Sequence, residues 1–395
     1  MKGFMHLIEV AVAGILIMII LGLFFTTQSV KLNWERTELI SINSNVLHTL
    51  KASNRLPELF SDTSNVLLET NDLRPPNVEY GIRISGIPKD VISVACPTDC
   101  SSVRSILSDN VYVNGRWIGF TVNTINMGSV NLTDYDALVL YNYNQYGTYE
   151  TQIRNYLSDD GTVVAIHNVT DSADSTFRSI FDLTSSAGAG TTSPNFTSYE
   201  PVNNDIAKYF LGFGFFAEAS TDVGSGTKQG KLDIWGTRFN FNLTSSTLRI
   251  SGQTVNEGDT FTLGGPDART YQFRVKKIHW SLSPSAVSIQ PTNTSYVFAY
   301  NMAAAYTGNN IVSVDDDASG CTANGKAIWI NEYEGTGNDH DYETLIKSAI
   351  ATSSTDWFIK DIRTDVERAE ASIFLPMCCD MPETAKIDMV SWYSY

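Results

Sequence analysis

Two histidines and several carboxylates are the side chains of this sequence whose types suit them to chemistry. His167 follows one apolar run, Glu332 and Glu334 follow another, and His340 and Asp341 stand a few residues later. A histidine near several carboxylates can bind a metal ion or exchange protons with a substrate. These five residues are the candidates for a ligand rim. We expect instead a polar loop edge in which His167 is hydrogen-bonded in place, because no complete catalytic arrangement can be named.

A short acidic segment carries half of a calcium-binding loop. Asp315, Asp317 and Ser319 would supply oxygens at loop positions 1, 3 and 5, and Gly320 would allow the turn at position 6. Position 12 is Lys326, where such a loop needs a bidentate glutamate. We therefore expect an acidic turn, with calcium as the alternative, and no other cofactor.

The five cysteines favour disulfide bonds over a metal site. Cys96 and Cys100 have a spacing that suits a metal, but no second cysteine pair or histidine pair completes a zinc site. A small disulfide loop is the better expectation in an oxidising compartment. The adjacent Cys378 and Cys379 cannot easily bond to each other, so one of them is a candidate partner for Cys321.

The composition excludes one class of partner. The net charge of the 395 residues is −16, without long acidic runs, and this argues against nucleic acid, which needs basic patches. Only 18% of residues are charged, while Ser, Thr, Asn, Gly and Tyr are plentiful, as is common in extracellular β-rich proteins. Five sequons are candidate glycosylation sites in that setting, namely Asn131, Asn168, Asn195, Asn242 and Asn293.

The apolar N-terminus suggests where the protein acts. Residues 4–25 are nearly all apolar, with Glu9 as the single acid, and are long enough to span a bilayer as one helix. Gly3, Phe4 and Glu9 together make this segment similar to the start of a type IV pilin precursor of the archaeal style. The resemblance implies leader cleavage after Gly3 by a prepilin peptidase, and assembly with other pilin-like subunits through the helix and Glu9. The alternative is an uncleaved membrane anchor.

An α/β domain must position the predicted ligand rim. Residues 134–141 and 162–167 are typical of buried strands with a helix between them, which predicts a βαβ unit. Residues 327–331 and a helix from about 341 to 350 repeat this pattern. Because open α/β sheets bind ligands at the carboxyl ends of their strands, the rim would lie at that edge.

The same segments carry a second resemblance. DYDALVLYN at 134–142 and ETQIRNYLSDDGTVVAIHN at 150–168 resemble the class I glutamine amidotransferase-like α/β family. In catalytic members the second strand ends at a Gly-x-Cys-x-Gly nucleophile elbow. His167 stands at about that place here, without a cysteine or flanking glycines. Because a thiolate mechanism needs the cysteine itself, we expect no enzymatic activity.

Hydrophobic periodicity and turn residues predict how the rest of the chain is divided into helices, strands and domains. Leu39 and Val46 belong to a heptad stripe that extends the first helix, and Asn114-Gly115 predicts a hairpin turn. The predicted class is an α+β multi-domain protein with a long N-terminal membrane helix. Its parts are a leader at 1–3, a transmembrane and stalk helix at 4–53, a β-rich head at 54–130, an α/β domain at 131–229 and 301–352, an inserted β-sandwich or barrel at 230–300, and strands at 353–395 that rejoin the head.

These observations predict a membrane-anchored, pilin-like surface protein with its bulk outside the cell. Its role would be structural, adhesive or filament-associated, and its partners would be the membrane and other pilin-like subunits. The alternative is a membrane-anchored ligand-binding or hydrolase-like module that uses the α/β domain. A single-pass membrane location, with a surface filament as one form, follows from either reading.

Overall fold

The chain forms two compact units. The computed structural model describes residues 27–60, 63–166, 175–181, 204–265, 268–292, 302–303, 312–315, 325–330, 339–360, 362–363, 365–377, 380 and 383–394. Unit 1 comprises residues up to Ile84 together with Phe358–Leu375 and Ala385–Tyr395. Unit 2 comprises Ser85–Trp357 and Pro376–Thr384. The chain therefore passes from one unit to the other four times.

Unit 1 combines helices from the N-terminal part of the chain with a sheet drawn from both ends. Its helices are α2 (Thr27–Ala52), the short η1 (Leu56–Phe60) and α3 (Thr63–Leu73). Its sheet has the order β19-β1-β21-β20. The strands are β1 (Val78–Ser85), β19 (Asp356–Lys360), β20 (Ala369–Met377) and β21 (Glu383–Tyr393).

Helix α2 is fastened to this sheet by one stripe of its surface. Leu39, Asn43 and Val46 are buried and recur at helical spacing. The Asn43 side-chain amide donates to the carbonyl oxygens of Ala369 (3.0 Å) and Met389 (3.1 Å) on β20 and β21. A buried side-chain amide that bonds two backbone oxygens fixes the position and rotation of the helix on the sheet.

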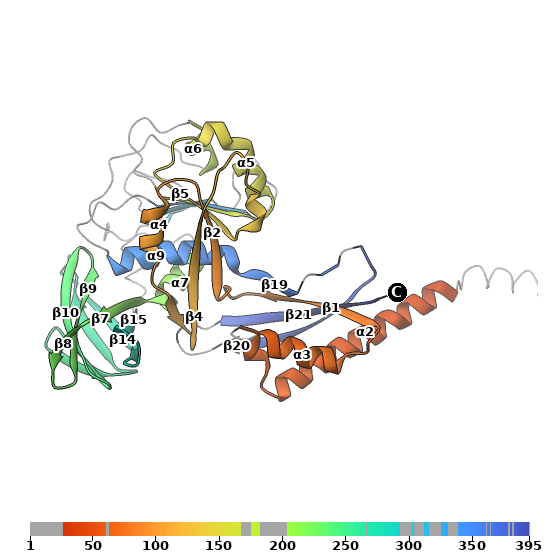
Figure 1. Ribbon diagram of the computed structural model, residues 1–395, viewed down its shortest axis with the longest axis horizontal. Coiled ribbons are helices and arrows are strands. Elements are labelled where there is room, and N and C mark those ends of the chain that lie inside the picture. The colour runs from red at the N-terminus through yellow and green to blue at the C-terminus, as the bar shows by residue number, and fades with distance from the viewer. Residues whose placement is uncertain are drawn as a thin grey trace, which may run out of the picture. The chain divides into compact units, whose positions relative to one another are not determined.

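Unit 2 is built on an eight-stranded, mostly parallel sheet (Figure 1). Its order is β16-β17-β18-β6-β5-β2-β4-β3, and the central strands β18, β6, β5, β2 and β4 all run parallel. The strands are β2 (Val91–Cys96), β3 (Val111–Val113), β4 (Arg116–Thr124), β5 (Ala137–Tyr141), β6 (Thr162–Ile166), β16 (Met302–Ala303), β17 (Val312–Asp315) and β18 (Lys326–Ile330). The short helix η2 (Leu132–Asp134) precedes β5.

Helices cover both faces of this sheet, so its central strands are apolar throughout. The helices are α4 (Cys100–Ile106), α5 (Tyr146–Ser158), α6 (Ser175–Ile180), α7 (Asn204–Phe213) and α9 (His340–Ala351), which continues into η3 (Thr352–Ser354). Alternate residues separate the two faces: Val163 and Ala165 pack toward α5 and α6, whereas Val164 and Ile166 pack toward α4, α7 and α9.

Two antiparallel sheets are inserted between β6 and β18. Their orders are β12-β11-β10-β9-β8 and β13-β14-β15-β7, and their inward side chains share one apolar core with α7 and α9. The strands are β7 (Phe215–Ala219), β8 (Thr221–Gly224), β9 (Thr227–Ile234), β10 (Thr237–Leu243), β11 (Thr247–Ile250), β12 (Gln253–Asn256), β13 (Thr260–Gly264), β14 (Thr270–His279) and β15 (Ser285–Pro291). The range 230–300 of the predicted inserted β domain overlaps these two sheets, which begin at β7.

The structure corrects the predicted fold class and location. The described part of the chain is β-rich, with four sheets, and its first helix is α2 rather than a membrane helix. In the part of the chain from Thr27 onward that the structure describes, none of the helices combines the length and apolar character needed to cross a bilayer. The predictions of a long N-terminal membrane helix and a single-pass membrane location are therefore wrong on this finding. Gly3, Phe4 and Glu9 lie outside the described residues.

The predicted β-rich head at 54–130 is divided between the two units. Strand β1 lies in one sheet with β19, β20 and β21. Strands β2, β3 and β4 instead form part of the large α/β sheet of unit 2. The predicted hairpin at Asn114-Gly115 is the β3–β4 turn, with φ of 50° and 83°.

Candidate functional site

A polar cavity of about 340 Å³ in unit 2 is the strongest candidate site. Helix α9 contributes His340 and Glu343, strand β7 contributes Glu218, and β9 contributes Lys231. Asp109, in the segment that follows α4, completes the charged lining. The cavity therefore gathers side chains from the α/β layer and from the inserted sheets.

Helical spacing places the α9 residues of this site. His340, Glu343 and Lys347 follow one another at intervals of three and four, so they lie on one face of the helix. Glu343 and Lys347 are buried, with 9% and 5% of their surfaces exposed. Their acidic and basic groups therefore act on each other in a medium of low polarity.

The β9–β10 turn holds the start of α9. The Asp339 carboxylate accepts hydrogen bonds from the Gly236 N–H at 3.2 Å, and the Asp341 carboxylate accepts one from the Trp235 N–H at 3.3 Å. Trp235 and Gly236 both have positive φ, which presents successive N–H groups to the helix. Asp341 is thus engaged by the backbone of this turn.

His340 fastens the same junction and also lines the cavity. Its Nδ1 lies 3.1 Å from both the backbone nitrogen and the carbonyl oxygen of Asp233, so it accepts from the N–H or donates to the carbonyl according to the tautomer of the ring. Burial lowers the pKa of His340, and the backbone contact with Asp233 opposes this effect. The Asp233 carboxylate accepts two hydrogen bonds from the Arg238 guanidinium, at 2.8 and 3.0 Å.

Glu343 is the unusual group of the cavity. Among the described residues, its carboxylate accepts no hydrogen bond and forms no ion pair, although Lys347 and Asp109 act on it electrostatically. Burial raises the pKa of Glu343 to about 7, with Asp109 adding to this effect and Lys347 opposing it. Asp109 also raises the pKa of Glu218, after burial. An incompletely satisfied buried carboxylate at a cavity wall is typical of a functional site.

A close backbone approach shapes the floor of the cavity. Gly230 on β9 packs against β7, and a Cβ at this position would lie 2.2 Å from the Glu218 carbonyl oxygen. It would also lie 2.3 Å from the Phe241 ring. Only glycine allows the two strands to pass this closely and brings Glu218 toward α9.

The other predicted rim residues cannot be placed beside this cavity. His167, Glu332 and Glu334 lie outside the described residues, so the predicted rim is not tested as a whole. For the calcium alternative, Asp315 is the last residue of β17, while Asp317 and Ser319 lie outside the described residues. Among the residues that are described, no three His, Cys, Asp or Glu side chains are grouped so that they could hold a metal ion.

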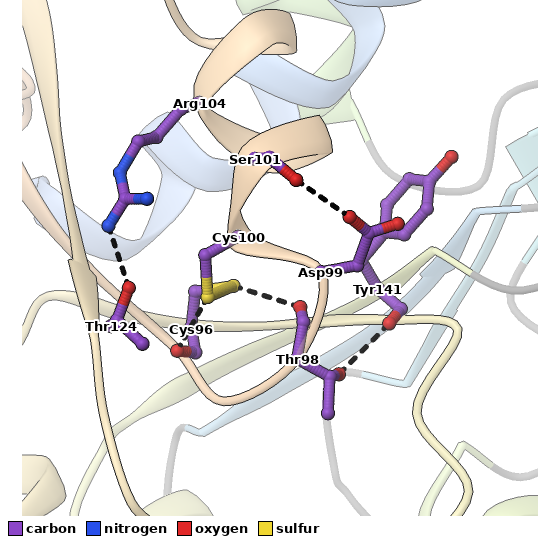
Figure 2. The surroundings of a disulfide bond; sticks show 8 residues. All are labelled: Cys96, Thr98, Asp99, Cys100, Ser101, Arg104, Thr124 and Tyr141. Atoms are coloured by element: carbon purple, nitrogen blue, oxygen red, sulfur yellow. Dashed lines mark hydrogen bonds between the residues drawn. A yellow bond between two sulfur atoms is a disulfide. The ribbon is translucent and has the colours of Figure 1, made fainter.

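Cys96 and Cys100 form a disulfide at the carboxyl end of β2 (Figure 2). Their Cα atoms are 5.7 Å apart. Within the loop they close, the Thr98 hydroxyl donates to the Tyr141 carbonyl oxygen (3.0 Å) and so ties it to β5. The loop is therefore fixed to the parallel sheet. Cys321, Cys378 and Cys379 lie outside the described residues.

Two of the five sequons are described. Asn131 is exposed before η2, where its side-chain amide donates to Asp134 (3.1 Å) and its oxygen accepts from the Thr133 hydroxyl (3.0 Å). Asn242 lies on β10 and is partly buried. Glycosylation stays a prediction at both, and Asn168, Asn195 and Asn293 lie outside the described residues.

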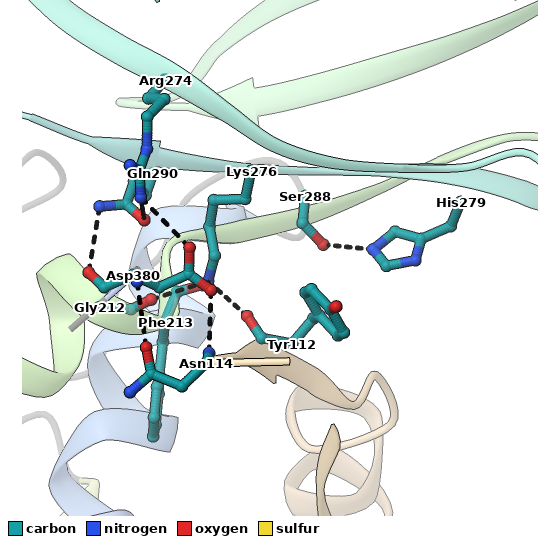
Figure 3. A network of polar contacts seen from close by, with 10 residues as sticks. All are labelled: Tyr112, Asn114, Gly212, Phe213, Arg274, Lys276, His279, Ser288, Gln290 and Asp380. Atoms are coloured by element: carbon teal, nitrogen blue, oxygen red, sulfur yellow. Dashed lines mark hydrogen bonds and ion pairs between the residues drawn. The ribbon is translucent and has the colours of Figure 1, made fainter. Parts of the chain in front are cut away.

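A second buried polar network lies at the base of the inserted sheets (Figure 3). The fully buried ammonium of Lys276 donates to the carbonyl oxygens of Gly212 (2.8 Å), Phe213 (3.2 Å) and Tyr112. Asp380 lies 3.5 Å from this ammonium. The network opens onto no cavity described here, so we assign it to stability.

Asp380 connects this network to the β3–β4 turn. Its carboxylate accepts from the Asn114 N–H (2.9 Å) and from Arg274 (3.2 Å). Its own N–H donates to the Asn114 side-chain oxygen at 3.0 Å. These bonds hold Asp380 against the β3–β4 turn and β14.

A larger cavity, of about 470 Å³, lies in unit 1. Its acidic groups Glu370 and Asp388 are both paired with Lys386, at 3.6 and 2.8 Å. Arg368 donates to the Arg363 carbonyl oxygen at 3.3 Å. Because these charges are already engaged, the unit 2 cavity is the better candidate.

Sequence reasoning had found His340 but not Asp109, Glu218 or Glu343. The spacing of His340, Glu343 and Lys347 on a predicted helix was the one local signal available. Comparison with known proteins adds nothing to the assignment: no protein-family model matches the chain, and no curated protein or solved structure has significant similarity to it.

Proposed function

We propose that this chain is a structural protein of the pilin-like class, with a filament-associated or adhesive role. The resemblance of its N-terminal sequence to type IV pilin precursors supports this proposal. So does the architecture of unit 1, in which a long helix near the N-terminus lies on a four-stranded sheet. In this proposal, copies of the chain associate through α2, and unit 2 is the part exposed on the resulting assembly.

The observation that carries the proposal is the exposure of Trp34. Its side chain is 74% exposed, which is unusual for the largest apolar side chain. Trp34 and the buried Asn43 are nine positions apart, about two and a half helical turns, so they lie on opposite faces of α2. One face of α2 thus binds the sheet of unit 1, while the other offers an aromatic anchor. We infer that α2 of a second copy packs against it.

Self-association of the full chain tests this proposal. We expect sedimentation to show concentration-dependent oligomers that Trp34→Asp weakens at least tenfold, because an aromatic anchor is replaced by a charge. Leu68→Asp is the matched control, since Leu68 is 63% exposed on α3 of the same unit and should have no effect. A monomer at high concentration, or equal effects of the two substitutions, would contradict the proposal.

A second proposed function is a ligand-binding module in unit 2. The carboxylate of Glu343 supports it, since it is buried at a cavity wall and accepts no hydrogen bond from the described residues. Retaining such a group lowers stability, and a bound ligand that pairs with it would offset this cost. No catalytic step is proposed, because the described cavity does not pair a nucleophile with a base.

A further inference from the structure

We propose that the unit 2 cavity binds a primary ammonium ion carried on a small hydroxylated framework, such as an amino sugar. This inference rests on the second proposed function, because it names the ligand class of that same cavity. It follows from three features of the cavity: its charge, its neutral polar lining and the unpaired carboxylate of Glu343.

The charges that face the cavity favour a cation. Asp109, Glu218 and Glu343 bring three carboxylates from three separate segments of unit 2. The opposing positive charges are Lys231, which lines the cavity, and the buried Lys347, which acts electrostatically on Glu343. The remaining titratable groups that line the cavity are His340, which is hydrogen-bonded to the Asp233 backbone, and Asp233, whose carboxylate pairs with Arg238. The carboxylates are therefore in excess of the free cations.

The position of Glu343 specifies an ammonium group. A primary ammonium carries three N–H donors, whereas the ionised carboxylate offers only acceptors. Only 9% of the surface of Glu343 is exposed, and none of the described residues donates a hydrogen bond to its side chain. An ammonium bound here would supply the hydrogen-bond donors that this carboxylate does not find among the described residues, and a positive charge in addition to that of Lys347.

The rest of the lining fits hydroxyl groups better than alkyl chains. Ser108, Ser220, Thr221 and Gln229 contribute neutral polar groups to the wall. Each can both donate and accept, as sugar hydroxyls do. A cavity of about 340 Å³ also suits a molecule of monosaccharide size rather than a bare ion.

A bare divalent cation fits the cavity less well. Such an ion needs several oxygen ligands converging at 2.3–2.6 Å if it is calcium. In the described ranges no three acidic, histidine or cysteine side chains converge in that way. The carboxylates are spread around the wall, as suits an organic cation that contacts them through separate groups.

Titration calorimetry on the full chain tests the inference with glucosamine as the probe. We expect glucosamine to bind at pH 7, where most of it carries the ammonium, and the neutral N-acetylglucosamine to bind at least tenfold more weakly, because it lacks the ammonium. Glu343→Gln and Asp109→Asn should each weaken glucosamine binding at least tenfold. Asp72→Asn, which removes an exposed charge in unit 1, is the matched control and should leave binding unchanged.

The pH dependence gives an independent readout of the same site. Burial raises the pKa of Glu343 to about 7, with Asp109, Asp339 and Asp341 adding to this effect and Lys347 opposing it. Glucosamine should therefore bind more tightly as the pH rises from 5 to 7, where this carboxylate ionises while the amine of glucosamine stays protonated. The Glu343→Gln variant should lose that dependence. An unchanged profile in the variant would overturn the role of Glu343.

The outcomes separate this inference from the second proposed function. Equal binding of the two sugars, or binding of calcium chloride alone that Glu343→Gln abolishes, would overturn the ammonium assignment while retaining a ligand site. If glucosamine, N-acetylglucosamine and calcium chloride all fail to bind, the inference is overturned. The ligand-binding function proposed for unit 2 would then have no support from this cavity. Thermal melts of each variant establish that the fold is kept.

Discussion

Asp380→Ala is expected to lower the free energy of unfolding at pH 7 by about 3–5 kcal/mol, the usual cost of leaving a buried charge without its partner. Lys276 is the charge left behind, and its ammonium is fully buried. The substitution also removes the acceptor for the Asn114 N–H and for Arg274. Chemical denaturation monitored by fluorescence measures the loss.

The pH dependence of this loss follows from Lys276. Burial lowers the pKa of Lys276 to about 8 in the folded state, against 10.5 for the unfolded chain, and Asp380 opposes that lowering. Without Asp380 the pKa falls further, so the variant differs most from the wild type while Lys276 is charged. We therefore expect the destabilisation to be largest below pH 7 and to shrink as the pH rises through 8.

An exposed ion pair provides the control. Arg363 and Asp365 are 2.6 Å apart but 59% and 65% exposed. Asp365→Ala should cost less than about 1 kcal/mol, as is usual for surface pairs. Equal losses for Asp380→Ala and Asp365→Ala would show that the buried network does not stabilise unit 2.

Glu343→Gln should stabilise the free protein at pH 8 by an amount on the order of 2–3 kcal/mol. The pKa of Glu343 is about 7 in the folded state and 4.5 in the unfolded chain. Between these values the folded state binds more protons, so the stability that Glu343 contributes is lost as the pH rises toward 7. Glutamine resembles the protonated acid and stays neutral, so the variant avoids this loss.

The difference between variant and wild type is the quantity to measure. It should be near zero at pH 4, grow between about pH 4.5 and 7, and stay constant above that range. Asp72→Asn should show no comparable rise. A variant that is no more stable at pH 8 than at pH 4 would mean that the Glu343 carboxylate is not held in an unfavourable environment.

The local elements of unit 2 could be predicted from the sequence because their signals are local. The apolar runs at 134–141 and 162–167 contain β5 and β6, the run at 327–331 covers β18 except for its first residue, and the helix expected near 341–350 is α9. Strands buried on both faces need continuous apolar runs, and helices covering them need one apolar stripe. These requirements are visible within about ten residues.

Membership of a sheet and of a site depends on contacts between distant segments. The Asn114-Gly115 turn predicts a hairpin, but nothing in its sequence indicates that the hairpin edges the α/β sheet rather than a separate head. Asp109, Glu218 and Glu343 likewise lie far apart in the sequence, and only the fold brings them to one cavity. The apolar N-terminus gave the strongest local signal, yet the location inferred from it is not supported by the described helices.

Photo-crosslinking from position 34 tests the assembly role of α2 most directly. The full chain would carry benzoylphenylalanine in place of Trp34, with the same group at Leu68 as the matched control. The account predicts crosslinked dimers and higher species from position 34, with the crosslinked peptide mapping to α2 of another copy. An absence of crosslinks from position 34, or an equal yield from position 68, would contradict it.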